Sequence, residues 1–270
     1  MIPGQASHTA RAVAAYRLGF ERLTCPAGGD LGDPASNDLG DPASDDLLTA
    51  TVAAGITVDT TSRMSRYLEA RTRFFDRLVV DAIGRGVPQI VNLGAGYDGR
   101  ALRFRHRGVQ WFEVDHPDTQ ADKRHQLTAL AIAHADIRFV AIDFASGTDL
   151  ADAMHGAGFD GSVEALVLWE GVVAYLEVAD ILATLRSLRQ AVAPGSRLGV
   201  SVATFTDEVR HGAFARAVGE MGEQAAPRIT PDVAGELLRE TGWSVTPGGS
   251  EARGDGSASA RLGFVIASAG

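Results

Sequence analysis

A short apolar strand that runs directly into a glycine-rich loop is the feature that most constrains this chain. Residues 89–99 read Gln-Ile-Val-Asn-Leu-Gly-Ala-Gly-Tyr-Asp-Gly, which places glycines at Gly94, Gly96 and Gly99. Without a Cβ atom, glycine lets the backbone turn sharply, approach a ligand and pack a following helix against the strand. The pattern predicts a Rossmann-like nucleotide site. It fits a dinucleotide of the NAD type and the adenosine and methionine portions of S-adenosylmethionine equally well.

The next strand is predicted to end in carboxylates. A helix is expected from about Asp98 to Arg107, followed by a strand over residues 110–115 that carries Glu113 and Asp115 near its end. A carboxylate at the end of the second strand suits a ribose diol, because it can accept two hydroxyl hydrogen bonds. Asp115 is the predicted ribose ligand, whereas Glu113 could instead be an outward-facing strand residue. Both cofactors carry a ribose, so this strand does not separate them.

Two further strand ends favour S-adenosylmethionine. The apolar run that begins at Ile137 stops at Asp143 and Phe144, which offer an acceptor and a ring face to an adenine. The run over residues 164–171 ends in Glu170. Open parallel sheets bind ligands beyond the carboxyl ends of their strands. A cationic amino group beside a sulfonium would be stabilised by Glu170, whereas a nicotinamide does not need it.

At this point the sequence resembles the leucine carboxyl methyltransferase family of S-adenosylmethionine-dependent enzymes, over roughly residues 8–205. The order and spacing of five separate motifs make the resemblance specific. These motifs are Arg71-Thr-Arg-Phe-Phe-Asp76, Val91-Asn-Leu-Gly-Ala-Gly-Tyr-Asp98, Phe112-Glu-Val-Asp-His-Pro117 with Lys123 after it, Asp143-Phe144, and Glu170-Gly-Val-Val-Ala-Tyr-Leu176.

The resemblance implies a fold, a cofactor and a set of binding residues. The fold is α/β: a Rossmann-like class I methyltransferase sheet, mostly parallel with an antiparallel last strand, with helices on both faces and an N-terminal helical lid. The implied contacts to S-adenosylmethionine are Arg71 on the methionine carboxylate, Gly94 and Gly96 along the methionine backbone, Asp115 on the ribose, Asp143 with Phe144 around adenine, and Glu170 at the methionine amino group.

Arg71 also has independent support. Apolar residues at helical spacing predict a helix over Ser62–Gly84, which carries several arginines. Most of these charges should form a solvated face. A planar guanidinium is the natural bidentate partner of a carboxylate, so one of them can serve as a ligand. The resemblance selects Arg71, with Arg73 as the alternative.

Strand and helix alternate along the rest of the chain, which predicts a parallel sheet with helices on both faces. We expect an N-terminal helical or lid region over residues 1–60 and a methyltransferase domain over residues 61–270. The segment 30–45 contains a near-perfect eight-residue repeat rich in Gly, Pro and Asp, predicted as a mobile surface insertion or a lid over the substrate. Downstream elements are predicted as helices over 178–193, 207–221 and 231–241, a strand over 196–205, a hairpin connection over 247–259 and last strands near 243–246 and 261–268.

Composition excludes several classes of protein. The chain has 270 residues, 45% of them hydrophobic, enough for one large α/β domain. It has no 18-residue apolar run, and residues 1–23 lack the apolar core of a signal peptide, so no membrane span and a cytoplasmic location are expected. A net charge of −9 argues against a nucleic-acid partner. The single cysteine, Cys25, excludes an internal disulfide, and the histidines show no metal-ligand spacing, so no metal is predicted.

The predicted chemistry is in-line methyl transfer to an oxygen of a small-molecule or peptide acceptor. A carboxylate acceptor is ionised at neutral pH and needs no general base, whereas an alcohol or phenol usually does. Because no base stands out at the strand ends, a carboxylate is the first expectation. Tyr175 is the candidate catalytic residue that would orient this carboxylate, and it could equally be a core aromatic. His116 is interpreted as a turn residue rather than a weak base.

Three alternatives stay open. One is a hydroxyl O-methyltransferase of the same fold. Another is an NAD(P)-dependent oxidoreductase, although no Tyr-x-x-x-Lys motif follows the loop. The third is a cofactor-binding protein without catalysis. The sequence makes no prediction of the oligomeric state.

Overall fold

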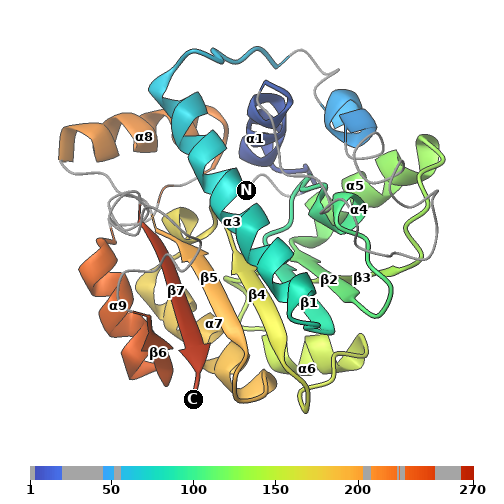
Figure 1. The fold of residues 1–270 in the computed structure, drawn as a ribbon. Helices are drawn as coiled ribbons and strands as arrows, with labels where there is room; N and C mark the ends of the chain where they lie inside the picture. The colour runs from blue at the N-terminus through green and yellow to red at the C-terminus, as the bar shows by residue number, and fades with distance from the viewer. Residues whose placement is uncertain are drawn as a thin grey trace.

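A seven-stranded sheet runs through the centre of the molecule (Figure 1). In this computed structural model the strand order is β3-β2-β1-β4-β5-β7-β6, with β7 antiparallel to both of its neighbours and the first five strands parallel. This confirms the predicted sheet. The strands are β1 (Gln89–Leu93), β2 (Gln110–Asp115), β3 (Ile137–Ala141), β4 (Ala165–Trp169), β5 (Arg197–Ser201), β6 (Trp243–Val245) and β7 (Phe264–Ala269).

The structure describes residues 4–19, 45–51, 56–202, 208–223, 225, 229–246 and 263–270. The predicted hairpin connection at 247–259 lies outside these residues, as does the repeat at 30–45 apart from Asp45. Within the described ranges, no helix is long and apolar enough to cross a membrane.

The central strands bring the predicted site residues to one edge of the sheet. All five residues of β1 and of β4 are buried, as continuous apolar strands covered on both faces should be. Leu93 at the end of β1 pairs with Val114 of β2 and with Trp169 of β4. The glycine loop, Asp115 and Glu170 therefore emerge side by side.

Helices cover both faces of the sheet (Figure 1). One face packs against α3, α4 and α5 through residues such as Phe75, Leu102 and Leu127. The opposite face packs against α6, α7 and α9. The helices are α1 (His8–Leu18), α3 (Arg63–Gly84), α4 (Arg100–Arg103), α5 (Pro117–Ala129), α6 (Leu150–Gly156), α7 (Val178–Ala191), α8 (Glu208–Glu220) and α9 (Pro231–Glu240), together with a 3₁₀ turn, η1 (Val173–Tyr175), and a helical stretch at 45–51.

The helix predicted from Asp98 to Arg107 is much shorter than expected. Only residues 100–103 form α4. The Asp98 carboxylate accepts a hydrogen bond from the Arg100 backbone N–H at 2.8 Å, so the helix begins there. Gly108, with φ of 85°, then turns the chain into β2. The later helices match their predicted positions to within two residues at each end.

Candidate functional site

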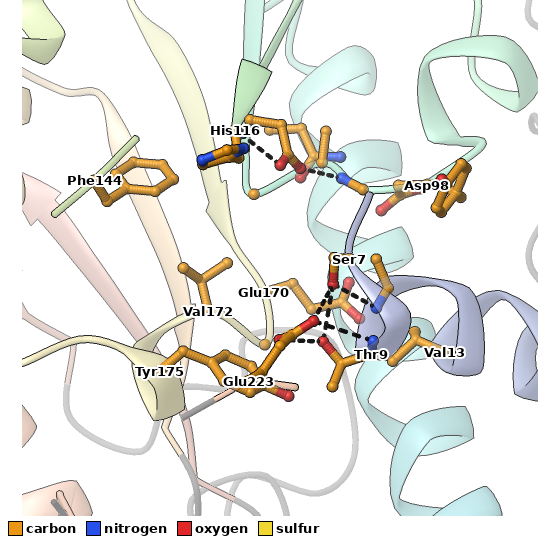
Figure 2. A pocket seen from close by; sticks show the side chains of 18 of the residues that line it. Ser7, Thr9, Val13, Asp98, His116, Phe144, Glu170, Val172, Tyr175 and Glu223 are labelled. Atoms are coloured by element: carbon orange, nitrogen blue, oxygen red, sulfur yellow. Dashed lines mark hydrogen bonds between the residues drawn. The ribbon is translucent and has the colours of Figure 1, made fainter. Parts of the chain in front are cut away.

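A cavity of about 730 Å³ lies beyond the carboxyl ends of the parallel strands, under α1 (Figure 2). Its position is the one that open α/β sheets use for ligands. All eight residues predicted from the sequence line this cavity: Arg71, Gly94, Gly96, Asp115, Asp143, Phe144, Glu170 and Tyr175.

Two glycines of the loop have positive φ angles, and one of them has no room for a Cβ atom. Gly94 has φ of 65°, and a Cβ atom there would lie 2.1 Å from the Val172 side chain. Gly96 has φ of 49°, and its Cβ would lie 3.2 Å from the Cβ of Ala10 on α1. Both positions favour glycine for conformation, and Gly94 also requires it for space. The loop thus lies between the segment after β4 and the N-terminal helix.

Asp115 is held in one orientation at the end of β2. Its Oδ2 accepts a hydrogen bond from the Gly96 backbone N–H, and its Oδ1 accepts one from His116 N–H at 2.6 Å. Burial raises the pKa of Asp115, and the two backbone donors partly oppose that rise. The carboxylate is therefore fixed by the backbone of the loop that forms the cavity floor.

Glu113 was predicted either near the ligand site at the end of the second strand or as an outward-facing strand residue, and the structure shows neither. It is 1% exposed and its Oε2 accepts a hydrogen bond from Lys123 Nζ at 2.6 Å, so it neither faces outward nor lines the cavity. Lys123 Nζ also donates to the Asp98 carbonyl at 2.7 Å. Helix α5 covers Glu113 and supplies the Lys123 cation. The strand pattern alone did not indicate this burial. Burial raises the pKa of Glu113 to about 7, although Lys123 acts in the opposite direction.

Three guanidinium groups converge on the Glu170 carboxylate. Oε1 accepts from Arg71 Nε and from Arg17 Nη2, each at 2.9 Å, and Oε2 accepts from Arg100 Nη1 at 2.6 Å. Burial would raise the pKa of Glu170, but the three arginines outweigh it and lower the pKa to about 2. Glu170 therefore stays ionised and joins α1, α3 and α4 to the end of β4.

The ion pairs extend below the cavity. Arg100 is fully buried and also donates to Asp98, to Asp76 Oδ1 at 2.7 Å and to the Thr72 carbonyl at 3.1 Å. Nearby arginines lower the pKa of Asp98 against the effect of burial. Sequence reasoning missed this network. The only local signal was Asp98 two residues before Arg100, which is too common a pair to be specific.

Asp143 and Phe144 follow β3 and form a third part of the lining. Asp143 Oδ1 accepts a hydrogen bond from Ala145 N–H at 3.0 Å, which orders the turn. Phe144 is partly buried and packs against the core beneath the sheet. The aromatic ring and the acidic side chain are thus placed together, as the sequence predicted.

Tyr175 lies on the other wall of the cavity, where η1 ends. Its ring centroid is 6.1 Å from that of Phe214 on α8. Burial raises the pKa of its hydroxyl, and the negative charge of Glu223 adds to this rise. Tyr175 is therefore a protonated hydroxyl facing a ligand site, although part of its ring packs as a core aromatic would.

His116 caps α5, as the turn interpretation predicted. Its Nδ1 accepts a hydrogen bond from the Asp118 backbone N–H at 3.3 Å. The imidazole still lines the cavity, near Phe144 (Figure 2). Arg73, the alternative to Arg71, pairs instead with Glu69 on the surface of α3 at 2.9 Å and does not line the cavity.

The N-terminal helix contributes lining residues that the sequence did not single out. Ser7, Thr9, Ala10, Val13 and Arg17 all face the cavity. Two buried donors in the lining have no hydrogen-bond partner: Nε of Arg17 and Nδ2 of Asn92. Orphaned buried N–H groups are rare in folded proteins. Both donors are buried in the cavity wall rather than exposed to the cavity.

Residues 29–189 match the sequence pattern of the leucine carboxyl methyltransferase family. The chain belongs to this family. A relative from Mycolicibacterium gilvum, provisionally named an S-adenosyl-L-methionine-dependent methyltransferase, is 34% identical over 206 residues, 68% of this chain and 64% of the relative. A relative of the same provisional name from Mycobacterium tuberculosis is 38% identical over 152 residues, 54% of this chain and 50% of the relative. The chain thus matches between half and two thirds of the length of these curated relatives.

Two solved structures share the fold. A DUF574 family protein from Streptomyces avermitilis has a TM-score of 0.60 at 17% identity, covering 98% of both chains. Magnesium protoporphyrin IX methyltransferase from Synechocystis, solved with bound S-adenosylhomocysteine, has a TM-score of 0.51 at 12% identity, covering 79% of this chain and 90% of that one. At these identities the likeness concerns the fold alone.

The leucine carboxyl methyltransferase match includes most, but not all, of the cavity lining. The glycine loop, Asp115, Asp143, Glu170 and Tyr175 lie within residues 29–189. Helix α1 and Glu223 lie outside the matched residues, yet both line the same cavity.

Proposed function

We propose that this chain is an S-adenosylmethionine-dependent methyltransferase acting on an oxygen of a small-molecule or peptide acceptor. The observation that carries the proposal is the convergence of four strand ends on one cavity. Gly94 and Gly96 follow β1, Asp115 ends β2, Asp143 follows β3 and Glu170 follows β4.

The residues present fit this cofactor. A cavity of about 730 Å³ lies within the range of small-molecule sites. The lining supplies carboxylates for a ribose and an adenine amino group, and the Arg71 guanidinium for a carboxylate. Acidic side chains outnumber basic ones in the lining, which suits a ligand that carries an ammonium and a sulfonium.

Each residue has a proposed task. Asp115 would hold the ribose hydroxyls, and Asp143 with Phe144 would frame the adenine. Arg71 uses its Nε for Glu170, so its terminal Nη nitrogens can bind the methionine carboxylate as a bidentate donor. Glu170 would neutralise the amino group, while its three arginine partners keep it ionised.

The bound cofactor supplies a methyl carbon already activated by a positively charged sulfur. The protein then needs to align the acceptor and to exclude water, and such positioning can lower a barrier by roughly 7 to 11 kcal/mol at its best. Helix α1 covers the cavity, and Val172 and Phe144 supply apolar surface. The proposed acceptor is a carboxylate oriented by the Tyr175 hydroxyl, whose raised pKa keeps it a donor.

A hydroxyl acceptor is the second candidate, and one observation favours it. The Glu223 carboxylate and the His116 imidazole both line the cavity. Either could take up the proton that an alcohol or phenol releases, and a carboxylate acceptor would be repelled by Glu223. The two candidates share the cofactor and the fold.

Two experiments test the proposal. Calorimetric titration should detect binding of S-adenosylhomocysteine and no binding of NADH; the reverse result would overturn the methyltransferase assignment in favour of an oxidoreductase. Incubation with labelled S-adenosylmethionine and a metabolite extract from the source cells should then give a labelled product. Release of methanol from that product in base identifies an ester, and a base-stable label identifies an ether.

A further inference from the structure

Helix α1 lies across the cavity, and different contacts hold it on three sides. Thr9, Ala10, Val13 and Arg17 follow one another at intervals of one, three and four residues, so they lie on one face of the helix, which faces the cavity. This part of the cavity wall can open only if some part of α1 moves. The contacts that hold the helix therefore decide which side opens.

The cofactor side of α1 is held by buried charges. Arg17 Nη2 lies 2.9 Å from Glu170 Oε1 and 3.4 Å from Asp98 Oδ2, and all three side chains are less than a tenth exposed. Separating them would take from Glu170 one of its three guanidinium partners and would break the ion pairs of a buried arginine, which is unfavourable. This end of the helix is the harder one to release.

The α5 side of α1 is held by several hydrogen bonds. The Gly4 backbone N–H donates to Asp118 at 2.9 Å, and the Ser7 N–H donates to Thr119 Oγ1 at 3.1 Å. Arg11 donates to Asp122 at 3.1 Å. These contacts fasten the helix to the element that follows β2, on the side of the proposed ribose site.

The third side is held by the Glu223 carboxylate and by Tyr175, which shares a side-chain hydrogen bond with Thr9. Glu223, shortly after the end of α8, accepts hydrogen bonds from the Ser7 and Thr9 hydroxyls at 2.7 Å each and from the Thr9 N–H at 3.3 Å (Figure 2). Tyr175 lies beside this contact. Glu223 is only partly buried and Gly222 is exposed. Water can therefore compete for this carboxylate more easily than for Glu170.

We propose that Glu223 is a positioning residue that latches α1 over the acceptor end of the cavity. Release of the Glu223 contacts opens the wall next to Tyr175, while Arg17 and the α5 contacts keep the cofactor end covered. The acceptor and the methylated product then exchange through this opening with the cofactor still in place. This inference rests on the proposed function for the identity of the two ligands.

The latch can be tested by the reactivity of a thiol placed under it. Val13→Cys in a Cys25→Ser background puts the chain's single thiol on the cavity face of α1. In saturating S-adenosylhomocysteine, Glu223→Ala should raise the rate of modification by a small thiol reagent at least tenfold. Glu223→Gln should have a smaller effect, because its amide keeps one acceptor oxygen. Glu220→Gln, an exposed residue at the end of α8 that does not line the cavity, should stay within twofold.

The dissociation rate of S-adenosylhomocysteine reports on opening of the cofactor side. The dissociation rate of S-adenosylhomocysteine should stay within threefold of the parent in Glu223→Ala and should rise at least tenfold in Arg17→Ala. Equal thiol reactivity in Glu223→Ala and its parent would overturn the latch. If Glu223→Ala raises the dissociation rate of S-adenosylhomocysteine as much as it raises thiol reactivity, the claim that only the acceptor side opens would be overturned. If no protein binds S-adenosylhomocysteine, the proposed function fails, and thiol reactivity without ligand still tests the latch.

Discussion

Glu170 shows how a single residue can serve both the fold and the site. Its side chain is 3% exposed and contacts Arg17, Arg71 and Arg100, which come from three different helices. A buried carboxylate is tolerated only when it is paired and hydrogen-bonded. The same contacts that satisfy the charge also place the arginines around the cavity. Changes at this position should therefore affect stability and ligand binding together.

Replacing Glu170 by glutamine tests this dual role. The amide cannot balance the arginines, so we expect the free energy of unfolding to fall by about 3 to 5 kcal/mol, the usual cost of removing one partner of a buried pair. Urea unfolding at pH 7 measures it. Asp136→Ala is the control, because Asp136 pairs with Arg105 at the surface and its side chain is 57% exposed. A loss no larger than that of Asp136→Ala would mean that the buried pairs contribute little.

Arg71 and Arg73 lie on the same helix and make a matched pair for the cofactor contact. Arg71→Ala should weaken binding of S-adenosylhomocysteine by about 1.5 to 3 kcal/mol, the range for hydrogen bonds to a charged group. Arg73→Ala should leave the affinity unchanged, because Arg73 pairs with Glu69 on the surface of α3. Calorimetric titration of both variants decides the assignment. Equal losses, or a loss only at Arg73, would contradict the role predicted for Arg71.

The glycine loop is the element whose conformation the sequence predicted best. Gly94→Ala adds a Cβ that would lie 2.1 Å from Val172, in a residue with φ of 65°. Gly86→Ala is the matched control, since Gly86 has φ of 75° but no atom within 4 Å of the added Cβ. Both variants carry a backbone cost of about 1 to 2 kcal/mol.

Only Gly94→Ala adds a steric cost, and overpacking of this kind typically amounts to a further 1 to 3 kcal/mol. We also expect it to reduce binding of S-adenosylhomocysteine, because the loop must shift away from Val172. Thermal unfolding with and without ligand separates the two effects. If both variants lose the same stability, the close contact with the segment after β4 does not constrain the loop.

Helix α1 illustrates what the sequence could not predict. The resemblance indicated an N-terminal helical lid, but no local rule pairs Ser7 with Glu223, 216 residues later. The strand pattern also did not predict that Glu113 is buried, because its partner Lys123 comes from helix α5, which covers it. Short-range patterns specify strands, caps and tight turns. Contacts between distant segments depend on how the elements pack.

At the scale of the whole molecule, the sheet explains why the main site residues were predictable. Parallel strands place their carboxyl ends at one edge, so residues that follow four separate strands must lie near each other. Gly94, Asp115, Asp143 and Glu170 meet this condition, and all line one cavity. The interior ion pairs were not predictable in the same way, because burial of charge depends on the complete fold.

The pH dependence of stability provides a test of one of these buried charges. The pKa of Glu113 is raised to about 7 by burial, which Lys123 only partly opposes. In the unfolded chain a glutamic acid loses its proton near pH 4.3. Between these values the folded protein retains a proton that the unfolded chain has released. Stability contributed by Glu113 is therefore full below about pH 4.3 and is lost as the pH rises toward 7. Glu170, whose pKa is lowered to about 2, acts in the opposite direction and only at acid pH.

Comparison with Glu113→Gln isolates this contribution. The glutamine does not titrate, so the difference in unfolding free energy between the wild type and the variant should change with pH between about 5 and 7.5. We expect the wild type to lose up to about 3 kcal/mol relative to the variant over this range, from roughly 1.36 kcal/mol per unit of pKa shift. Urea unfolding at half-unit steps of pH measures the difference, in which groups common to both proteins cancel. A difference that stays flat would mean that Lys123 keeps Glu113 ionised throughout, and the carboxylate would then act as the fixed counter-charge that anchors α5 beneath the glycine loop.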